Sequence, residues 1–435
     1  MSHRSIRPSR LRLALATCTV TVIGLTLLPA GASAAPKDPT AALEQSIDAL
    51  VHDFVDQTNL PGITVAVTRK GRLLLTKGYG HKLVDGATKI PMTASMRSRI
   101  GSVSKAIATG PAAYQLLLAN GIDPQTTTLY GPGGLFEGDF DSDIAAGIAN
   151  FAPESADWEQ WYSQITIQHL FDHRAGLNGG GDISGAAQMF GVAEQDVTYA
   201  MAHSHFLQNR ALLFEPGTNS KYSNHGMGLF TLIIERLSGK SYYNYVRDDY
   251  LAPMGMQNRI RPEYANPDSC DAYNHTYGQG DTSSLSTSAL PAPEPLPFEQ
   301  YGLGLAAGGF RSSAQDLTWA MRWLTDNYSW DEIDRMGWFK SSKGKLGHSG
   351  SIGGGKAYVA MFPKGYESNS GLNLSEVSVA VATNIRVKHG SVSSLASQIA
   401  LQVPQSHVPH NVDLWREATQ SCARPERIGS FSSRG

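Results

Sequence analysis

The chain has 435 residues, of which 41% are hydrophobic and only 17% are charged, and its 36 Lys+Arg nearly balance its 38 Asp+Glu. The net charge of −2 argues against a polybasic nucleic-acid-binding protein and against an acidic tail. The apolar content is sufficient for a packed core, and the length suits one large domain with an insertion or two to three average domains.

The first 34 residues have the pattern of a secretory signal peptide. A stretch with four arginines precedes an apolar run, Leu13–Leu28, and Ala32-Ser33-Ala34 forms an A-x-A cleavage site. An uncleaved membrane anchor is the alternative, but Pro29 and Gly31 favour cleavage before Ala35. No later stretch is long and apolar enough to span a bilayer, so we expect a secreted protein without stable membrane insertion.

Secretion would place the mature chain in an oxidising compartment, where disulfides persist. Three cysteines are too few for a disulfide scaffold or a cysteine-built metal site. Signal cleavage removes Cys18 and leaves Cys270 and Cys422, for which we expect a single disulfide that ties the tail to the body. Two free thiols are the alternative.

The mature chain begins with a predicted helix over 41–58, where apolar side chains recur at helical spacing. Leu60-Pro61-Gly62 ends this helix, and two strands are predicted at 63–68 and 73–76 with a turn between them. A helical run from Lys105 to Leu118 follows a loop.

The middle of the chain, about 120–320, has helical segments separated by Gly- and Pro-rich loops and contains a polar stretch, Asp281–Pro297. Strand patterns return at 356–362 and 377–383, and a helical run covers 392–401. Strands near both ends with helices between them predict an α+β fold, in which a helical lobe interrupts a sheet built from both termini.

We therefore divide the chain into a signal peptide (1–34), one domain (35–410) and a C-terminal tail (411–435). Within the domain, the sheet lobe is expected from about 35–100 and 321–410, and the helical lobe from about 101–320. A functional site is expected in the cleft between the lobes.

The first chemical motif is Ser102-Val103-Ser104-Lys105, an S-x-x-K sequence where a loop enters a predicted helix. A serine hydroxyl needs an adjacent base, and Lys105 lies one turn after Ser102 on the same helix face. The helix N-terminus also offers a free N–H to a developing oxyanion. The pattern alone is weak, because Ser342-Lys343-Gly344-Lys345 repeats it in a polar turn.

The second motif is Tyr222-Ser223-Asn224, in a loop after Glu215-Pro216-Gly217. A tyrosine near a lysine ammonium can have its pKa lowered and share in proton transfer. Asn224 can accept a hydrogen bond from Lys105 and donate one to a substrate carbonyl. Tyr242-Tyr243-Asn244 matches the same pattern within a predicted helix, so the loop context distinguishes the two.

The third motif is His348-Ser349-Gly350-Ser351, which precedes Ile352-Gly353-Gly354-Gly355 and an apolar strand. Small residues on an edge strand let a substrate backbone pair alongside, and the strand's N–H groups can complete an oxyanion hole. A Gly-rich hairpin with a surface histidine is the structural alternative.

The order and spacing of these motifs, roughly 120 residues apart, resemble the serine hydrolases of the β-lactamase and penicillin-binding-protein family. The most similar group comprises class C β-lactamases, D-alanyl-D-alanine carboxypeptidases and related esterases. Flanking segments that match are Ile167–Leu177, Pro216-Gly217, Glu235–Gly239, Pro253–Met256 and Ala307–Gly309. The resemblance extends over about 41–400 and implies a β-lactamase-like fold, an antiparallel sheet flanked by helices from both chain ends.

The resemblance also implies a mechanism. An amide or ester carbonyl would acylate Ser102, Lys105 and Tyr222 would handle its proton, and the N–H groups of Ser102 and Ser351 would bind the oxyanion. The implied substrate-binding residues are Asn224, His348, Ser349, Gly350 and Ser351. Lys105 and Tyr222 would titrate as a coupled pair, which leaves the identity of the base open.

The third motif departs from the Lys-Thr-Gly that is typical of β-lactamases. Histidine is mostly neutral near pH 7 and offers no permanent cation to a substrate carboxylate, although Lys340, Lys343 or Arg386 could serve instead. This departure makes β-lactamase activity less expected, and a histidine at this place resembles certain secreted carboxypeptidases and esterases of the family. The resemblance therefore implies a hydrolase of D-amino-acid peptides, similar to D-alanyl-D-alanine carboxypeptidases. A small-ester esterase or a β-lactamase of this family is the alternative, and a non-catalytic sensor of cell-wall peptides is a rival from another class.

No cofactor or metal is predicted. His169 and His173 lie four residues apart, but no third ligand with suitable spacing accompanies them. The glycines at 353–355 lack the lysine and Ser/Thr of a phosphate-binding loop. The expected partner is a small peptide, amide or ester substrate, not nucleic acid, and the sequence does not indicate an oligomeric state.

Overall fold

The computed structural model describes residues 39–151, 157–263, 268–277, 285–287, 303–388, 390–403 and 415. The predicted signal peptide, most of the polar stretch Asp281–Pro297 and all of the tail except Trp415 lie outside this part. A search of the described helices for a membrane-spanning segment finds none that is long and apolar enough.

The strands in chain order are β1 (Gly62–Arg69), β2 (Arg72–Asp85), β3 (Thr88–Pro91), β4 (Ser98–Arg99), β5 (Arg261–Pro262), β6 (His275–Tyr277), β7 (Leu285–Thr287), β8 (Phe310–Ser312), β9 (Phe339–Lys340), β10 (Leu346–Ile352), β11 (Gly355–Met361) and β12 (Val377–Thr383). The α-helices are α1 (Pro39–Thr58), α2 (Gly110–Ala119), α3 (Asp141–Phe151), α4 (Asp157–Ser163), α5 (Ile167–Phe171), α6 (Ile183–Phe190), α7 (Tyr199–Asn209), α8 (Asn224–Gly228), α9 (Phe230–Ser238), α10 (Tyr242–Tyr245), α12 (Leu303–Gly308), α13 (Ala314–Asn327), α14 (Trp330–Asp334) and α15 (Val392–Leu401). Three short helices of other types are η1 (Lys105–Thr109), η2 (Glu194–Asp196) and η3 (Val246–Leu251).

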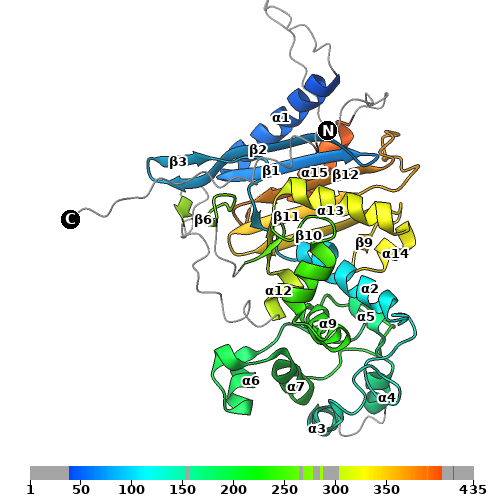
Figure 1. Ribbon diagram of the computed structural model, residues 1–435. Coiled ribbons are helices and arrows are strands. Elements are labelled where there is room, and N and C mark those ends of the chain that lie inside the picture. The colour runs from blue at the N-terminus through cyan, green and yellow to red at the C-terminus, as the bar shows by residue number, and fades with distance from the viewer. Residues whose placement is uncertain are drawn as a thin grey trace, which may run out of the picture.

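Seven strands form one antiparallel sheet in the order β3-β2-β1-β12-β11-β10-β9 (Figure 1). The two ends of the chain meet where β1 pairs with β12, with Ile63 opposite Thr383. The four predicted strands correspond to β1, β2, β11 and β12, and the predicted terminal helices to α1 and α15. The expected α+β architecture with a sheet built from both chain ends is confirmed.

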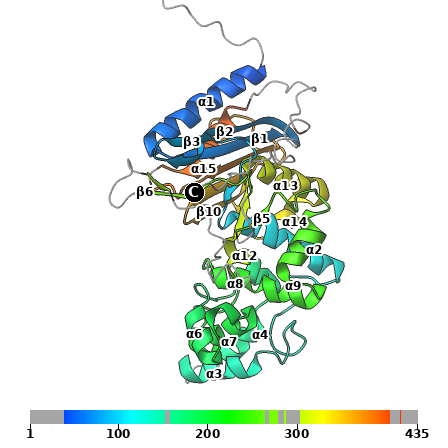
Figure 2. The same ribbon diagram turned by 60° about the vertical axis from the view of Figure 1, so that its left-hand side comes forward.

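Both faces of the central strands are buried, and side-chain size alternates between them. Val67 and Val379 are paired neighbours, and both belong to the buried cluster that includes residues of α1 and α15. Figures 1 and 2 show these two helices against the sheet. Ala66 and Ala380 are paired on the opposite face, which α13 contacts. The period of two residues thus places large side chains on one face and small ones on the other, where a helix packs close to the sheet.

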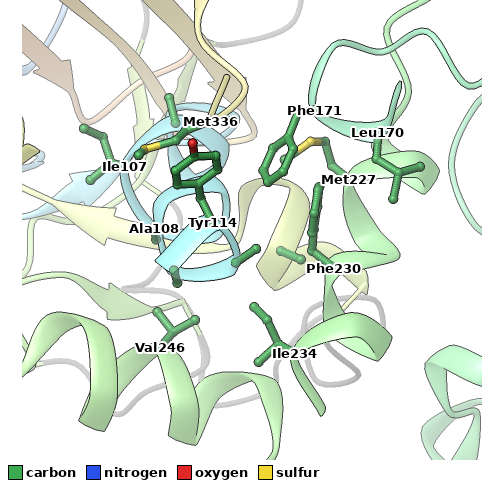
Figure 3. Close-up of a cluster of buried hydrophobic side chains, with 14 of the residues drawn as sticks. Ile107, Ala108, Tyr114, Leu170, Phe171, Met227, Phe230, Ile234, Val246 and Met336 are labelled. Carbon is green, nitrogen blue, oxygen red and sulfur yellow. The ribbon is translucent and has the colours of Figure 1, made fainter. Parts of the chain in front are cut away.

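The helices farthest from the sheet are α3, α4, α6 and α7, and α2, α8, α9 and α12 lie between them and the sheet (Figures 1 and 2). One buried apolar cluster joins this intermediate layer (Figure 3). Its members include Ile107 and Ala108 of η1, Tyr114 of α2, Leu170 and Phe171 of α5, Met227 of α8, and Phe230 and Ile234 of α9. The segments that carry the first and second motifs are therefore fixed to the same core.

The helix predicted from Lys105 to Leu118 has an irregular first turn that periodicity alone does not predict. It begins as a π-helical turn, η1, in which the Gly110 N–H donates to the Lys105 carbonyl, and it continues as α2. Pro111 has no N–H to donate, which favours a break in the regular ladder at this point. Such π-turns are frequent at functional sites, and this one starts at the lysine of the S-x-x-K motif.

Candidate active site

Ser102 lies in the turn between β4 and η1, where it is partly exposed. Gly101, just before it, has φ +51°, a left-handed backbone that glycine adopts without strain. Ser104 holds the turn, because its hydroxyl donates to the Gly101 carbonyl (2.6 Å) and accepts from the Phe310 N–H (3.3 Å). The turn leaves the hydroxyl of Ser102 accessible at the start of a helix whose next side chains are buried.

Lys105 is fully buried and has three hydrogen-bond partners. Its Nζ lies 3.0 Å from Ser102 Oγ and 2.8 Å from Asn224 Oδ1, and it also donates to the Ala307 carbonyl. Burial lowers the pKa of Lys105 from 10.5 to about 7. A neutral amine keeps two N–H groups for the oxygens of Asn224 and Ala307, which only accept, and its lone pair is then left for the hydroxyl of Ser102.

Tyr222 covers this lysine with the face of its ring, whose centroid is 4.9 Å from Lys105 Nζ. Desolvation raises the pKa of Tyr222 to about 12, and a hydrogen bond with Ser102 opposes part of the shift. The expectation that the lysine lowers this pKa is wrong, because desolvation of the phenol dominates and the nitrogen lies over the ring. Tyr222 is therefore a protonated phenol at neutral pH and can donate a proton.

The loop context separates the two Y-x-N sequences in the structure as well. Ser223 caps α8 by accepting from the Gly226 N–H (2.9 Å), and Asn224 follows as the first helical residue, with its side chain at Lys105. Tyr242 instead lies in α10, where its hydroxyl forms a 2.7 Å hydrogen bond with the hydroxyl of Thr109. The second copy of the pattern is part of the packed helical core.

His348 of β10 is buried, with only 2% of its surface exposed. Its Nδ1–H donates to the Ser349 carbonyl (2.8 Å), and burial together with the nearby Lys105 charge lowers its pKa to about 3. His348 is therefore a neutral ring within the protein and offers no positive charge to a substrate. Ser349 and Ser351 of the same strand are exposed.

Gly350 allows β10 to lie directly against the nucleophile turn. A Cβ atom at Gly350 would collide with the Ile100 carbonyl and lie 3.0 Å from the Ser102 nitrogen, and one at Gly101 would lie 2.8 Å from the Ser351 nitrogen. The Ser102 N–H makes no hydrogen bond to another residue of the described chain. The backbone nitrogens of Ser102 and Ser351 thus lie at one narrow contact, as an oxyanion hole requires.

The outer edge of β10 is open beside this contact. Among the described strands, β9 pairs with β10 only through Leu346 and Gly347, so the segment from His348 onward has no strand on that side. Phe339 of β9 is 50% exposed, and its ring centroid is 5.0 Å from that of His348 and 6.3 Å from that of Tyr222. An extended substrate could pair with this edge and place an apolar group against Phe339.

Some of the groups at this site have no signal in the sequence. The Ala307 carbonyl is a backbone group, which no side-chain pattern indicates, although Ala307–Gly309 was one of the matching flanks. Phe339 stands alone before a polar turn and carries no signal. Of the candidate cations, Lys340 pairs with Asp334 (2.7 Å) and Lys343 reaches the Glu367 carbonyl (3.4 Å).

Two other expectations concern cysteine and metal. Cys270 is disulfide-bonded, and Cys422 lies outside the described residues, so their pairing stays a prediction. In the described part of the chain, no three His, Cys, Asp or Glu side chains form a group that could hold a metal ion. His173, considered above for a metal, lies instead against Tyr222, with ring centroids 4.4 Å apart.

Comparisons with known proteins agree with this geometry. A family model described as Beta-lactamase matches residues 47–403. Protein flp of Staphylococcus aureus (strain N315) is 24% identical over 243 residues, which is 56% of this chain and 43% of the relative. The chain therefore aligns with less than half the length of this relative.

Solved structures show the same fold at low identity. The octameric penicillin-binding protein homologue from Pyrococcus abyssi has a TM-score of 0.59 and 20% identity, covering 86% of this chain and 80% of that one. The D-amino acid amidase from Ochrobactrum anthropi SV3, complexed with D-phenylalanine, has a TM-score of 0.55 and 18% identity, covering 83% and 98%. The fold is thus β-lactamase-like. The chain belongs to the β-lactamase family of serine hydrolases.

Proposed function

We propose that this chain is an exported serine hydrolase that forms an acyl-enzyme on Ser102 and acts on peptides or amides of D-amino acids. The observation that carries the proposal is the contact set of Lys105. A buried amine with a pKa of about 7, held by Asn224 and the Ala307 carbonyl, lies 3.0 Å from a serine hydroxyl. This arrangement supplies the adjacent base that a serine nucleophile requires.

The protonation states assign the roles in acylation. The Lys105 amine takes the proton of Ser102 as Oγ forms a bond to the substrate carbonyl carbon, and the carbonyl oxygen becomes an oxyanion at the N–H groups of Ser102 and Ser351. Tyr222, whose pKa is about 12, gives its proton to the departing nitrogen or oxygen as that bond breaks, and the Lys105 ammonium restores it. We therefore assign Lys105 as the base and Tyr222 as the acid.

Deacylation uses the same groups in reverse order. A water molecule attacks the acyl carbon, its proton passes to the Tyr222–Lys105 pair, and Ser102 Oγ leaves with a proton returned by Lys105. The side-chain nitrogen of Asn224 remains available for the substrate, because its Oδ1 accepts from Lys105.

Two features support a peptide-like substrate. The open edge of β10 offers backbone groups to an extended chain, and Phe339 offers an apolar surface next to it. The structural similarity to the D-amino acid amidase, which was solved with D-phenylalanine and also with L-phenylalanine, supports amino-acid amides as substrates, and the name of that enzyme supports the D-configuration.

A second candidate is an esterase or amidase for substrates without a carboxylate. The observation that favours it is His348, which is neutral and buried at the position where a substrate carboxylate would need a cation. Two D-alanyl-D-alanine peptides that differ only in a free or an amidated C-terminus separate the candidates. Preference for the free acid supports the carboxypeptidase type, and preference for the amide supports the second candidate.

The acyl-enzyme itself is tested by the intact mass of the mature protein after incubation with benzylpenicillin or a D-phenylalanine ester. We expect an adduct on the wild type and on Ser342→Ala, which lies in the exposed copy of the motif, and none on Ser102→Ala. An adduct that still forms on the Ser102→Ala variant would contradict the proposal. Rapid hydrolysis of the benzylpenicillin in the sample would instead indicate β-lactamase activity.

Export is a separate part of the proposal. Its support is the signal-like sequence of residues 1–34 and the disulfide at Cys270, a bond that persists in oxidising compartments. Expression in a secreting bacterium, followed by N-terminal sequencing of the protein in the medium, should give a chain that begins at Ala35. A chain that stays in the cell with Met1 intact would overturn this part.

A further inference from the structure

We propose that His173 is a positioning residue that sets the place of the Tyr222 phenol in the active site. This inference rests on the proposed function, because it assigns His173 a role through the proton donor Tyr222. His173 follows α5, and its own side chain makes no hydrogen bond with Ser102 or Lys105 in the described structure. Its effect would therefore be indirect.

The first observation is that His173 binds the backbone on both sides of Tyr222. Its carbonyl accepts from the Lys221 N–H (2.9 Å), and its Nδ1 accepts from the Ser223 N–H (3.3 Å). A single residue thus holds the backbone N–H groups of the two residues on either side of the tyrosine, which restricts the backbone from which the phenol extends.

The second observation is the packing of the rings. The His173 ring centroid lies 4.4 Å from that of Tyr222 and 5.9 Å from that of Phe339. His173 is 4% exposed, so its ring is enclosed while the Tyr222 ring remains partly open to solvent. The imidazole therefore provides a buried support for the inner part of the phenol ring.

The third observation is the backbone of His173, which has φ +56°. A left-handed conformation is uncommon outside glycine, and Asn, Asp and His are the residues that tolerate it best. It directs the chain from α5 back toward the Tyr222 loop. Strained backbone of this kind persists where the surrounding structure determines it, and often at functional sites.

The segment that carries His173 is anchored in the hydrophobic core. Phe171, two residues before His173, packs against Phe230 with ring centroids 4.3 Å apart, in the cluster that also contains Ile107 and Met227 (Figure 3). Ile107 follows Lys105 in η1, so the base and the support of the acid are fixed to the same cluster. The relative position of Lys105 and Tyr222 thus depends on α5 as well as on their own segments.

The neutral state of His173 preserves the hydrogen bond from Ser223. The titratable groups that face the ring are Lys105, Tyr222 and His348. Burial and the charge of Lys105 lower the pKa of His173 to about 4, so Nδ1 remains an acceptor through the neutral range.

A double-mutant cycle between His173→Ala and Tyr222→Phe tests the proposal. The substrates are the p-nitroanilide and the p-nitrophenyl ester of N-acetyl-D-phenylalanine. The nitrogen leaving group of the anilide must receive a proton as it departs, whereas the p-nitrophenolate of the ester leaves without one. We expect His173→Ala to lower kcat/KM for the anilide by about 10²-fold, which is the effect of a small misplacement of a catalytic group. When Tyr222 is already replaced by Phe, we expect His173→Ala to lower kcat/KM for the anilide by less than about threefold. With Tyr222 present, we expect the same small decrease for the ester.

His275→Ala is the matched control. His275 is also fully buried and accepts a backbone N–H, from Val84 (3.0 Å), but it lies in β6 and binds β2, not the Tyr222 loop. Its effect should be equal in both backgrounds and for both substrates. His173→Asn keeps an acceptor and a residue that tolerates the left-handed backbone, so it should retain anilide activity within about tenfold of wild type and remain folded if His173→Ala does not.

The outcomes are distinguishable. An equal loss for His173→Ala with and without Tyr222, or an equal loss on anilide and ester, would overturn the positioning role. If Tyr222→Phe itself left anilide hydrolysis unchanged, the proposed function of Tyr222 would fail instead. Anilide activity of His173→Asn as low as that of a folded His173→Ala would also contradict the proposal.

Discussion

Two segments of this chain have the same S-x-x-K spacing and lie in opposite environments. Ser102 and Lys105 belong to a turn and a helix whose lysine is fully buried, and the pKa of that lysine is lowered to about 7. Ser342 lies in an exposed turn, and Lys345 is only half-buried, with Nζ 6.0 Å from the ring centroid of Tyr358. The S-x-x-K spacing only brings a serine and a lysine close together. Burial and the fixed hydrogen-bond acceptors around Lys105 are what make this lysine a base at neutral pH.

The largest expected difference between the two segments is in turnover. Lys105→Met removes the base, and we expect kcat to fall by about 10³-fold on any substrate that the wild type hydrolyses. Lys345→Met removes a lysine from the exposed copy and should leave kcat within about twofold, as is usual for surface substitutions. Steady-state kinetics of both variants, with circular dichroism to verify folding, is the measurement. A similar decrease in kcat in both variants would contradict the assignment of Lys105, and not Lys345, as the base.

A second test uses the contact between β10 and the Ser102 turn. Gly350→Ala would press a Cβ atom against the Ile100 carbonyl, displace Ser102 relative to Ser351 and lower kcat by about 10²-fold. Gly353→Ala is the control, since its Cβ would meet only Arg99 Nη1 at 3.8 Å, an ordinary contact. We expect Gly353→Ala to retain activity. Normal kinetics in Gly350→Ala would show that the Ser102 turn does not depend on this close approach.

How far the sequence could predict this site depends on the type of group involved. Residue patterns located β1, β2, β11 and β12 and the two terminal helices, because such patterns follow from local geometry. The three-residue spacing of the S-x-x-K motif put Lys105 within reach of Ser102, although Ser102 itself lies in the turn before the helix. The pKa of Tyr222 was predicted with the wrong sign, since desolvation depends on tertiary packing that no motif encodes. The Ala307 carbonyl and the exposed ring of Phe339 belong to segments brought near the motifs only by the fold.

The buried copy of the motif should also show a distinct pH dependence. Only the neutral amine of Lys105 can accept the proton of Ser102, so kcat/KM should rise about tenfold per pH unit below about pH 7 and level off above it. The pKa of Tyr222 is about 12, so no falling limb is expected between pH 7 and pH 9. Rates measured from pH 5 to pH 9 decide this. A value of kcat/KM that keeps rising about tenfold per pH unit up to pH 9 would mean that the pKa of Lys105 stays near its ordinary value of 10.5 in the folded protein.

The smallest effect is a pH dependence of stability that only the buried copy should have. The pKa of Lys105 is 10.5 in the unfolded chain and about 7 in the folded protein, so between these values the unfolded state binds more protons. The contribution of Lys105 to the free energy of unfolding should therefore rise by about 1.4 kcal/mol per pH unit from about pH 7 to about pH 10, and Lys105→Met should lack this rise. Urea unfolding of both proteins at pH 7, 8 and 9 measures the difference, in which all other titrating groups cancel. A difference that does not change with pH would mean that Lys105 keeps its proton in the folded protein, and it could not then act as the base for Ser102.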